Sequence, residues 1–107
     1  MQTQIARPNA PDPRLSVVDR AVIDQRLQGM RRRIRALRIA RGWTQQDLGD
    51  RSGYWQSYIG QIERGQKRPP LETLFSLAQA LEVDALDLLA PIGPGERRAA
   101  PAEAMHG

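Results

Sequence analysis

The sequence contains no cysteine, a single histidine and no long hydrophobic run. Without cysteine the chain can form neither disulfides nor thiolate metal sites, and this composition agrees with a reducing cytoplasm. No apolar stretch approaches the roughly 20 residues that a membrane-spanning helix needs, and no signal peptide is visible. We therefore expect a cytoplasmic protein with no membrane-spanning segment.

Residue patterns that are typical of enzymes are also missing. The sequence has no paired nucleophile and base, no glycine-rich loop that would cradle a phosphate, and no cluster of metal ligands. His106 stands in a C-terminal segment, and we assign it no metal-binding or catalytic role. We expect no enzymatic activity, no cofactor and no metal.

Positive charge is abundant. The 107 residues carry a formal net charge of +4, and the sequence pI is about 10.6, which favours a polyanionic partner. Residues 30–41 hold a dense run of arginines: Arg31, Arg32, Arg33, Arg35, Arg38 and Arg41. Such a surface suits phosphate contact. A merely solvated face is the alternative, and we favour it for Arg31 and Arg32.

The two ends of the chain differ in composition from its middle. Residues 1–15 contain three prolines and few apolar residues, which predicts a flexible arm, either idle or able to reach along a polyanion. Residues 91–107 are rich in glycine, proline and alanine and predict a flexible tail. The length between them allows one small domain.

Residues 44–65 hold two short amphipathic segments joined by a break at Gly53. Thr44 is suited to cap the first segment, over about 45–51. Gly49 would cost roughly 1 kcal/mol relative to alanine in a helix, so its presence indicates that a second helix crosses closely, near Ile59. Neither segment is long enough to be stable alone. The second segment, about 55–64, has an apolar face formed by Tyr58, Ile59 and Ile62.

Residues 16–29 predict an additional N-terminal helix that precedes a helix over about 30–41. Ser16 and Asp19 resemble a capping box. An apolar stripe then recurs at spacings of four and three through Ile23, Leu27, Met30, Ile34 and Leu37. We favour a break or kink at Gly29 over one continuous helix. The segment would either pack on the edge of the domain or form a dimerisation surface.

The remaining helices follow from apolar spacing. Residues 71–81 predict a helix that buries Leu71, Leu74, Leu77, Ala78 and Leu81. Asp84 is suited to cap a last helix over about 85–90.

Together these segments resemble the phage-repressor and Cro-type helix-turn-helix family, also called the xenobiotic-response-element family. The resemblance covers about residues 30–90 and rests on RIRALRIARGWTQQDLGDRSG, YIGQIERG and PPLETLFSLAQALEVDALDLL. It implies an all-α fold, a compact five-helix helix-turn-helix domain, here with the additional N-terminal helix. YIGQIERG also resembles the controller proteins of restriction–modification systems.

The resemblance implies that the second helix of the motif reads DNA from the major groove. The side chains that it would turn toward base edges are Trp55, Gln56, Ser57 and Gln61. A glutamine amide can pair in bidentate fashion with adenine, whereas a serine hydroxyl discriminates weakly. Trp55 stands where the family commonly has a small polar residue, and we expect it to fold back onto the protein rather than contact thymine methyl groups or sugar.

Other positions follow from the same resemblance. The residues implied to contact DNA phosphates are Gln45, Arg64, Lys67 and Arg68. Arg38 and Glu63 resemble a partly buried ion pair that joins the first helix to the end of the recognition helix.

Three positions depart from the family pattern. Trp43 would fill the core in place of leucine, and Pro70 cannot cap a helix through a side-chain oxygen. Leu86 adds apolar surface near the place where such domains pair.

Two functions fit this sequence. The first is a sequence-specific transcriptional regulator that binds double-stranded DNA, as a homodimer on a near-palindromic operator. The second is a protein-interaction module, such as an antitoxin-like component, whose N-terminal helix contacts a protein partner.

Overall fold

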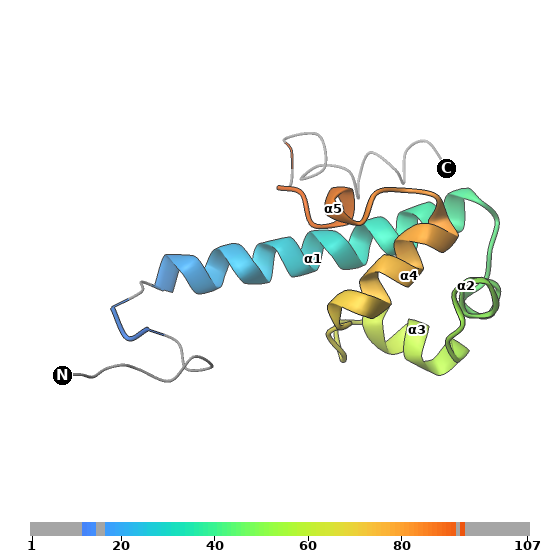
Figure 1. Ribbon diagram of the computed structural model, residues 1–107, viewed down its shortest axis with the longest axis horizontal. Coiled ribbons are helices and arrows are strands. Elements are labelled where there is room, and N and C mark those ends of the chain that lie inside the picture. The colour runs from blue at the N-terminus through green and yellow to red at the C-terminus, as the bar shows by residue number, and fades with distance from the viewer. Residues whose placement is uncertain (1–11, 15–16, 92, 94–107) are drawn as a thin grey trace.

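The computed structural model describes residues 12–14, 17–91 and 93, and these form five α-helices without a β-strand (Figure 1). The helices are α1 (Val17–Ala40), α2 (Gln45–Ser52), α3 (Gln56–Glu63), α4 (Leu71–Leu81) and α5 (Ala85–Leu88). This architecture confirms the predicted all-α class. Of the predicted arm, only residues 12–14 are described, and of the predicted tail only 91 and 93. His106 lies outside the described residues.

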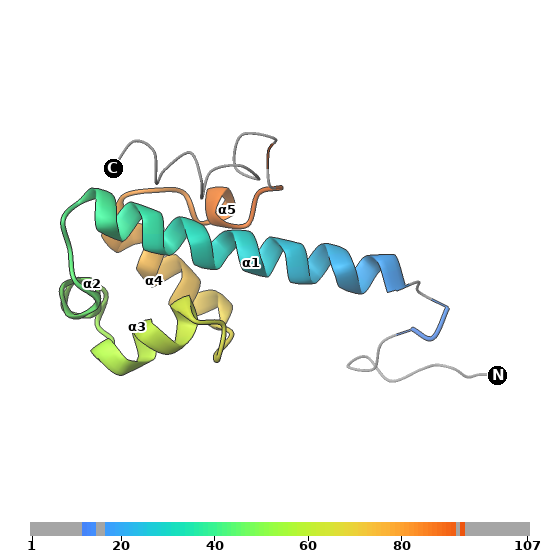
Figure 2. The ribbon, with the colours of Figure 1, turned by 180° about the vertical axis from the view of Figure 1, so that it is seen from behind.

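α1 is one uninterrupted helix of 24 residues, so the break expected at Gly29 is absent. Gly29 and the adjacent Met30 are buried, because this part of α1 packs on the rest of the domain. That packing outweighs the roughly 1 kcal/mol by which glycine weakens a helix. The N-terminal turns of α1 project beyond the other helices (Figures 1 and 2). Ile23 is accordingly 47% exposed although it continues the buried stripe.

The corner between α2 and α3 is built from local signals. The Thr44 side chain accepts a hydrogen bond from the backbone of Asp47, whose carboxylate accepts one from the Thr44 backbone, and α2 begins at this capping box. Gly53 ends α2 with a φ of 89°, which a residue with a side chain rarely adopts. A Cβ on Gly49 would lie 2.5 Å from the Tyr54 carbonyl oxygen. The close approach is therefore to the turn before α3, and not to Ile59 as expected.

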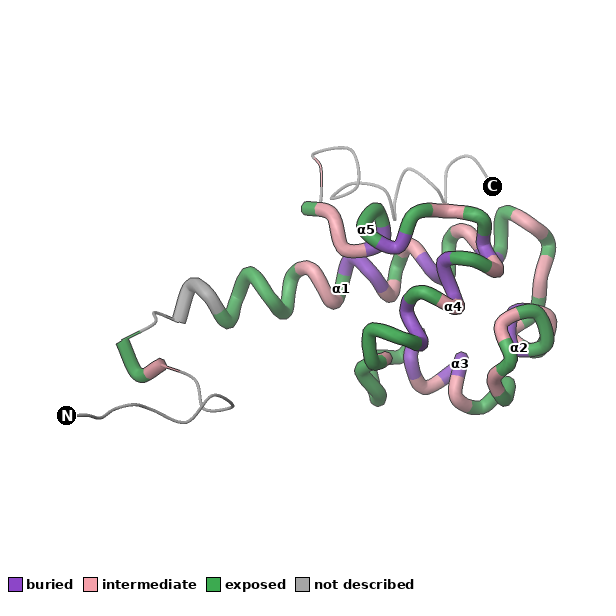
Figure 3. Tube along the Cα trace, in the orientation of Figure 1, coloured by how far each residue is buried: buried purple, intermediate pink, exposed green. Residues whose placement is uncertain are grey.

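The core lies where all five helices meet (Figure 3). α4 crosses its centre, with Leu77 and Leu81 fully buried, while Leu71 is 65% exposed and does not join the core as expected. α2 contributes a single large apolar side chain to this cluster, and α3 contributes two. The buried apolar residues are Met30, Ile34, Leu48, Ile59, Ile62, Leu74, Leu77, Ala78, Leu81, Ala85 and Leu88.

Arginines of α1 hold the chain that leaves α5. The Arg33 guanidinium donates to the carbonyl oxygens of Leu88 and Ala90, both at 2.9 Å, and Arg26 donates to that of Leu89 at 3.1 Å. These carbonyls have no partner within a helix, since α5 ends at Leu88 rather than near residue 90. Two of the basic residues of α1 thus have a structural role that the sequence pattern did not reveal.

The close packing at Gly49 generates a stability prediction. Gly49→Ala should lower the free energy of unfolding by about 2 kcal/mol, because the new methyl group would collide with backbone atoms that cannot move independently. Gly60→Ala is the matched control: its Cβ would meet only the ends of the Arg64 and Gln45 side chains. Urea denaturation followed by circular dichroism measures both variants. Equal losses at the two positions would contradict the interpretation of Gly49.

Candidate nucleic-acid interface

α3 separates apolar from polar residues along its length. Ile59 and Ile62 are fully buried against the core, whereas Gln56 and Ser57 are exposed and Gln61 is half-buried. The helix therefore keeps one apolar face inside the domain and presents a polar edge to solvent. Of the four residues expected at base edges, the structure places Gln56 and Ser57 fully on this outer edge and Gln61 partly on it.

Trp55, the fourth of them, lies immediately before α3 and is 85% exposed. The expectation that its ring folds back onto the protein is wrong. Trp55 occupies the N-cap position and its backbone is extended, so its side chain leaves the helix before the first turn that packs on the core. An indole held in solvent at the start of α3 adds a large apolar surface beside the polar edge.

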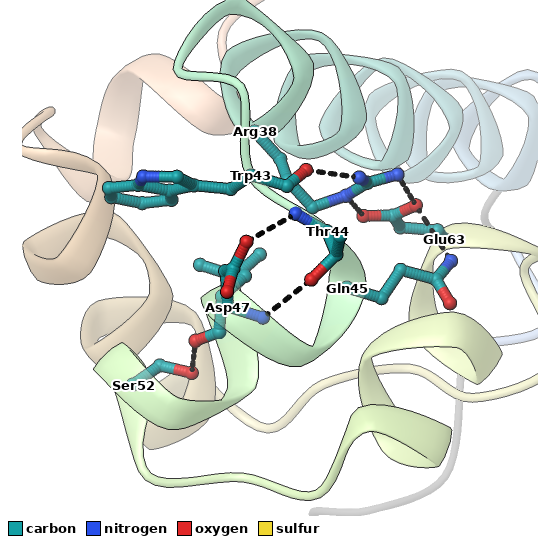
Figure 4. Close-up of polar contacts among 8 residues, drawn as sticks. Arg38, Trp43, Thr44, Gln45, Asp47, Ser52 and Glu63 are labelled. Atoms are coloured by element: carbon teal, nitrogen blue, oxygen red, sulfur yellow. Dashed lines mark hydrogen bonds and ion pairs between the residues drawn. The ribbon is translucent and has the colours of Figure 1, made fainter.

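Arg38 and Glu63 form a buried ion pair beneath this edge (Figure 4). The Arg38 guanidinium donates to both carboxylate oxygens, at 2.7 and 3.0 Å, and to the Trp43 carbonyl oxygen at 2.7 Å. Only 10% of the arginine side chain and 3% of the glutamate side chain are exposed. Glu63 is the only carboxylate of α3, and Arg38 neutralises it away from the outer edge.

Gln45, the first residue of α2, extends this cluster toward solvent. Its side-chain amide nitrogen donates to Glu63 at 3.2 Å, and this bond places the amide beside the N-terminus of α2 (Figure 4). The first backbone N–H groups of a helix have no partner within it and favour an anion. The Gln45 oxygen and the Arg64 guanidinium both lie over Gly60, where a Cβ would be 3.1 and 2.9 Å from them.

The loop after α3 carries three exposed cations. Arg64 donates through Nε to the Gln66 side-chain oxygen at 3.2 Å, while the backbone N–H groups of Gln66 and Lys67 both bond to the Gln61 carbonyl, at 2.8 and 3.2 Å. These bonds fold the loop against the end of α3. Arg68 lies 4.0 Å from the Asp24 carboxylate of α1, and both side chains remain more than half exposed. Arg64, Lys67 and Arg68 thus flank the polar edge on one side.

Trp43 is half-buried and packs against the core rather than filling it, since two arginines flank its ring. The Arg51 guanidinium carbon is 4.3 Å from the ring centroid, and that of Arg41 is 5.6 Å away. Near it, the capping hydrogen bonds from the backbone N–H and the side chain of Thr44 lower the pKa of Asp47. The T-x-x-D spacing from Thr44 to Asp47 is the local sequence signal for this capping box.

Two observations limit the chemistry of the site. Among residues 12–14, 17–91 and 93, no three histidine, cysteine or acidic residues gather as metal ligands would. Within the same part of the chain, no helix is long and apolar enough to cross a membrane.

The buried ion pair can be tested by removing one partner. Arg38→Met should lower the free energy of unfolding by roughly 3–5 kcal/mol, because Glu63 would be left as an uncompensated buried charge. The double variant Arg38→Met with Glu63→Leu should regain most of that loss, since no buried charge remains. Thermal denaturation of the wild type, the single variant and the double variant measures these differences. If the double variant were as unstable as the single one, the instability of Arg38→Met would not come from the buried charge of Glu63.

Comparisons with known proteins agree with this geometry. The HTH-type transcriptional regulator y4dJ of Sinorhizobium fredii, itself uncharacterized, is 44% identical over 55 residues, which cover 51% of this chain and 71% of y4dJ. The crystal structure of the restriction-modification controller protein C.AhdI from Aeromonas hydrophila aligns with a TM-score of 0.55 and 39% identity, over 58% of this chain and 94% of C.AhdI.

A third relative aligns over more of this chain. The hypothetical transcription factor NHTF from Neisseria has a TM-score of 0.61 and 30% identity, over 73% of this chain and 86% of its own. Residues 34–88 match the helix-turn-helix family as a whole, and this range includes the complete motif of α2 and α3. The chain therefore belongs to the helix-turn-helix family of the xenobiotic-response-element and Cro type, and it is a DNA-binding transcriptional regulator rather than an enzyme.

Proposed function

We propose that this regulator binds a near-palindromic operator as a homodimer and reads base sequence with α3 in the major groove. The observation that carries the proposal is the outer edge of α3, which is polar, free of uncompensated carboxylate and flanked by cations. A polyanion can approach this edge closely because Arg38 neutralises Glu63. Such a protein would act in the cytoplasm, in contact with chromosomal or plasmid DNA.

Direct readout is assigned to four side chains. The amides of Gln56 and Gln61 would pair with adenine edges, and Ser57 would bond to bases with weaker discrimination. The exposed ring of Trp55 would contact thymine methyl groups at the end of the half-site. Because none of these groups is charged, they supply selectivity more than affinity.

Affinity is assigned to phosphate contacts on either side of α3. Gln45 and the free N–H groups of α2 would bind one phosphate, while Arg64, Lys67 and Arg68 would follow the sugar-phosphate backbone. The hydrogen bond from Gln45 to Glu63 uses one hydrogen of its amide and leaves the other for a phosphate oxygen.

Selection of bound DNA from a random pool, followed by titration at several salt concentrations, tests this function. The chain should prefer the selected sequence to a scrambled one, and equal affinity for both would remove sequence-specific regulation. Gln56→Ala and Gln61→Ala should each reduce the preference for the selected sequence by about 1–3 kcal/mol while leaving the salt dependence unchanged. A fall in salt dependence would show that the wrong face had been assigned to the bases.

The dimer contact is proposed on α5 and the adjacent side of α4. Leu86 is 70% exposed and Phe75 is 53% exposed, and neither belongs to the edge of α3 that would face DNA. The projecting end of α1 is another apolar surface, with Val22 and Ile23 43% and 47% exposed. That end also favours the second candidate function, a protein-interaction module that uses α1.

Two matched variants separate these surfaces. Leu86→Lys should convert a dimer into a monomer in analytical ultracentrifugation, because it places a charge in the proposed apolar contact. Ile23→Lys should leave the mass unchanged. The reverse result would assign the dimer contact to α1. If the wild-type chain is monomeric both with and without operator DNA, the proposal of a homodimer is wrong.

A further inference from the structure

Three polar residues of α1 recur at intervals of seven and face α3 or the loop that follows it. Arg38 binds Glu63, the last residue of α3. Arg31 lies against Gly65, where a Cβ would be 3.0 Å from the Cζ and Nε atoms of the arginine. Asp24 lies 4.0 Å from Arg68. This row extends from the ion pair along α1 and follows the side of the loop after α3.

A cleft of about 210 Å³ lies at the outer end of this row. It is large compared with the space that one water molecule needs, so a phosphate group can enter it. Three cations and one carboxylate line it, together with the apolar stem of α1. The lining residues are Asp24, Leu27, Met30, Arg31, Gly65, Lys67 and Arg68.

The side chains of two cations of this cleft, Arg31 and Lys67, have no acceptor in the described part of the chain. Arg31 is half-buried, and no hydrogen bond or ion pair to a described residue satisfies its five N–H donors. The Lys67 side chain is exposed and has no such partner either, whereas Arg68 has a long contact of 4.0 Å with the Asp24 carboxylate. Arg32 and Arg35 are different, because they are exposed and do not line the cleft.

We propose that this cleft binds one backbone phosphate of the operator, with Arg31 as its main ligand and Lys67 and Arg68 beside it. The proposal rests on the proposed function and extends the DNA contact from α3 to α1. It replaces the expectation that Arg31 is merely solvated. Asp24 holds Arg68 back and repels the phosphate, so this carboxylate limits the affinity of the site.

Salt dependence of operator binding tests the role of Arg31. Neutralising one phosphate contact should reduce the slope of log K against log salt by about 0.9. Between 50 and 200 mM salt, the affinity of Arg31→Gln should therefore fall by a factor about 3.5 times smaller than the factor for wild type. This should hold on operator and scrambled DNA alike. Arg32→Gln and Arg35→Gln remove the same charge from exposed positions of the same helix and should leave the slope unchanged.

Removing the charge of Asp24 should raise the affinity for operator DNA, whereas removing the charge of Arg31 should lower it. Asp24→Asn should bind operator several-fold more tightly at 50 mM salt, because Arg68 is released and the repulsion is removed. Glu82→Gln is the matched control, since it removes the same charge from an exposed position at the end of α4. Arg31→Lys keeps the charge and should retain the wild-type slope, which separates a phosphate contact from a loss of folding.

Each result either supports or overturns the cleft. If Arg31→Gln has the slope of Arg32→Gln while operator preference persists, the phosphate site is overturned and the proposed function stands. Loss of operator preference in the wild-type chain would instead overturn the proposed function itself. A free anion is the other source of the same ligand. Inorganic phosphate alone is therefore titrated into the protein while the Arg31 side-chain resonance is followed by NMR. Saturation in the millimolar range together with an unchanged slope for Arg31→Gln would assign the cleft to a free anion.

Discussion

The ion pair between Arg38 and Glu63 sets the relation between α1 and the outer edge of α3. It joins the end of α3 to α1, and its hydrogen bonds also include the Trp43 carbonyl and the Gln45 amide. A buried pair of this kind contributes little net stability, because desolvation of both charges offsets most of their attraction. Its value lies in geometry: it ties the end of α3 to α1 and neutralises a carboxylate beneath the edge that we propose for DNA binding.

Packed helices hold the side chains that we propose to contact bases. α3 is anchored by Ile59 and Ile62, so the polar side chains on its opposite edge keep a fixed relation to the core. α2 begins at a capping box, which fixes the position of its free N–H groups beside Gln45. Side chains that stand on packed helices are placed more accurately than those on loops. The basic loop after α3 is itself tied back by two bonds to the Gln61 carbonyl.

Local sequence signals predicted the helices well and failed where packing at a distance mattered. The helix over residues 71–81 has the predicted bounds, and Gly42, Thr44 and Asp84 stand at the turn or caps that their chemistry favours. The break at Gly29 is absent because the cost of one glycine is smaller than the packing gained around Met30. Trp55 projects into solvent because its position before the helix, and not its apolar ring, decides its direction. The assignments to bases and phosphates stay predictions.

The sequence by itself determined the all-α class, the two-helix motif and the buried stripes, because caps, glycine turns and apolar spacing act within a few residues of each other. The family resemblance had already implied the ion pair of Arg38 with Glu63, but only the tertiary structure distinguished other arginines of α1. Arg26 and Arg33 bind the carbonyls at the end of α5, and Arg31 faces the basic loop. Their roles depend on which distant segment lies opposite each one, and that is settled only when the helices pack.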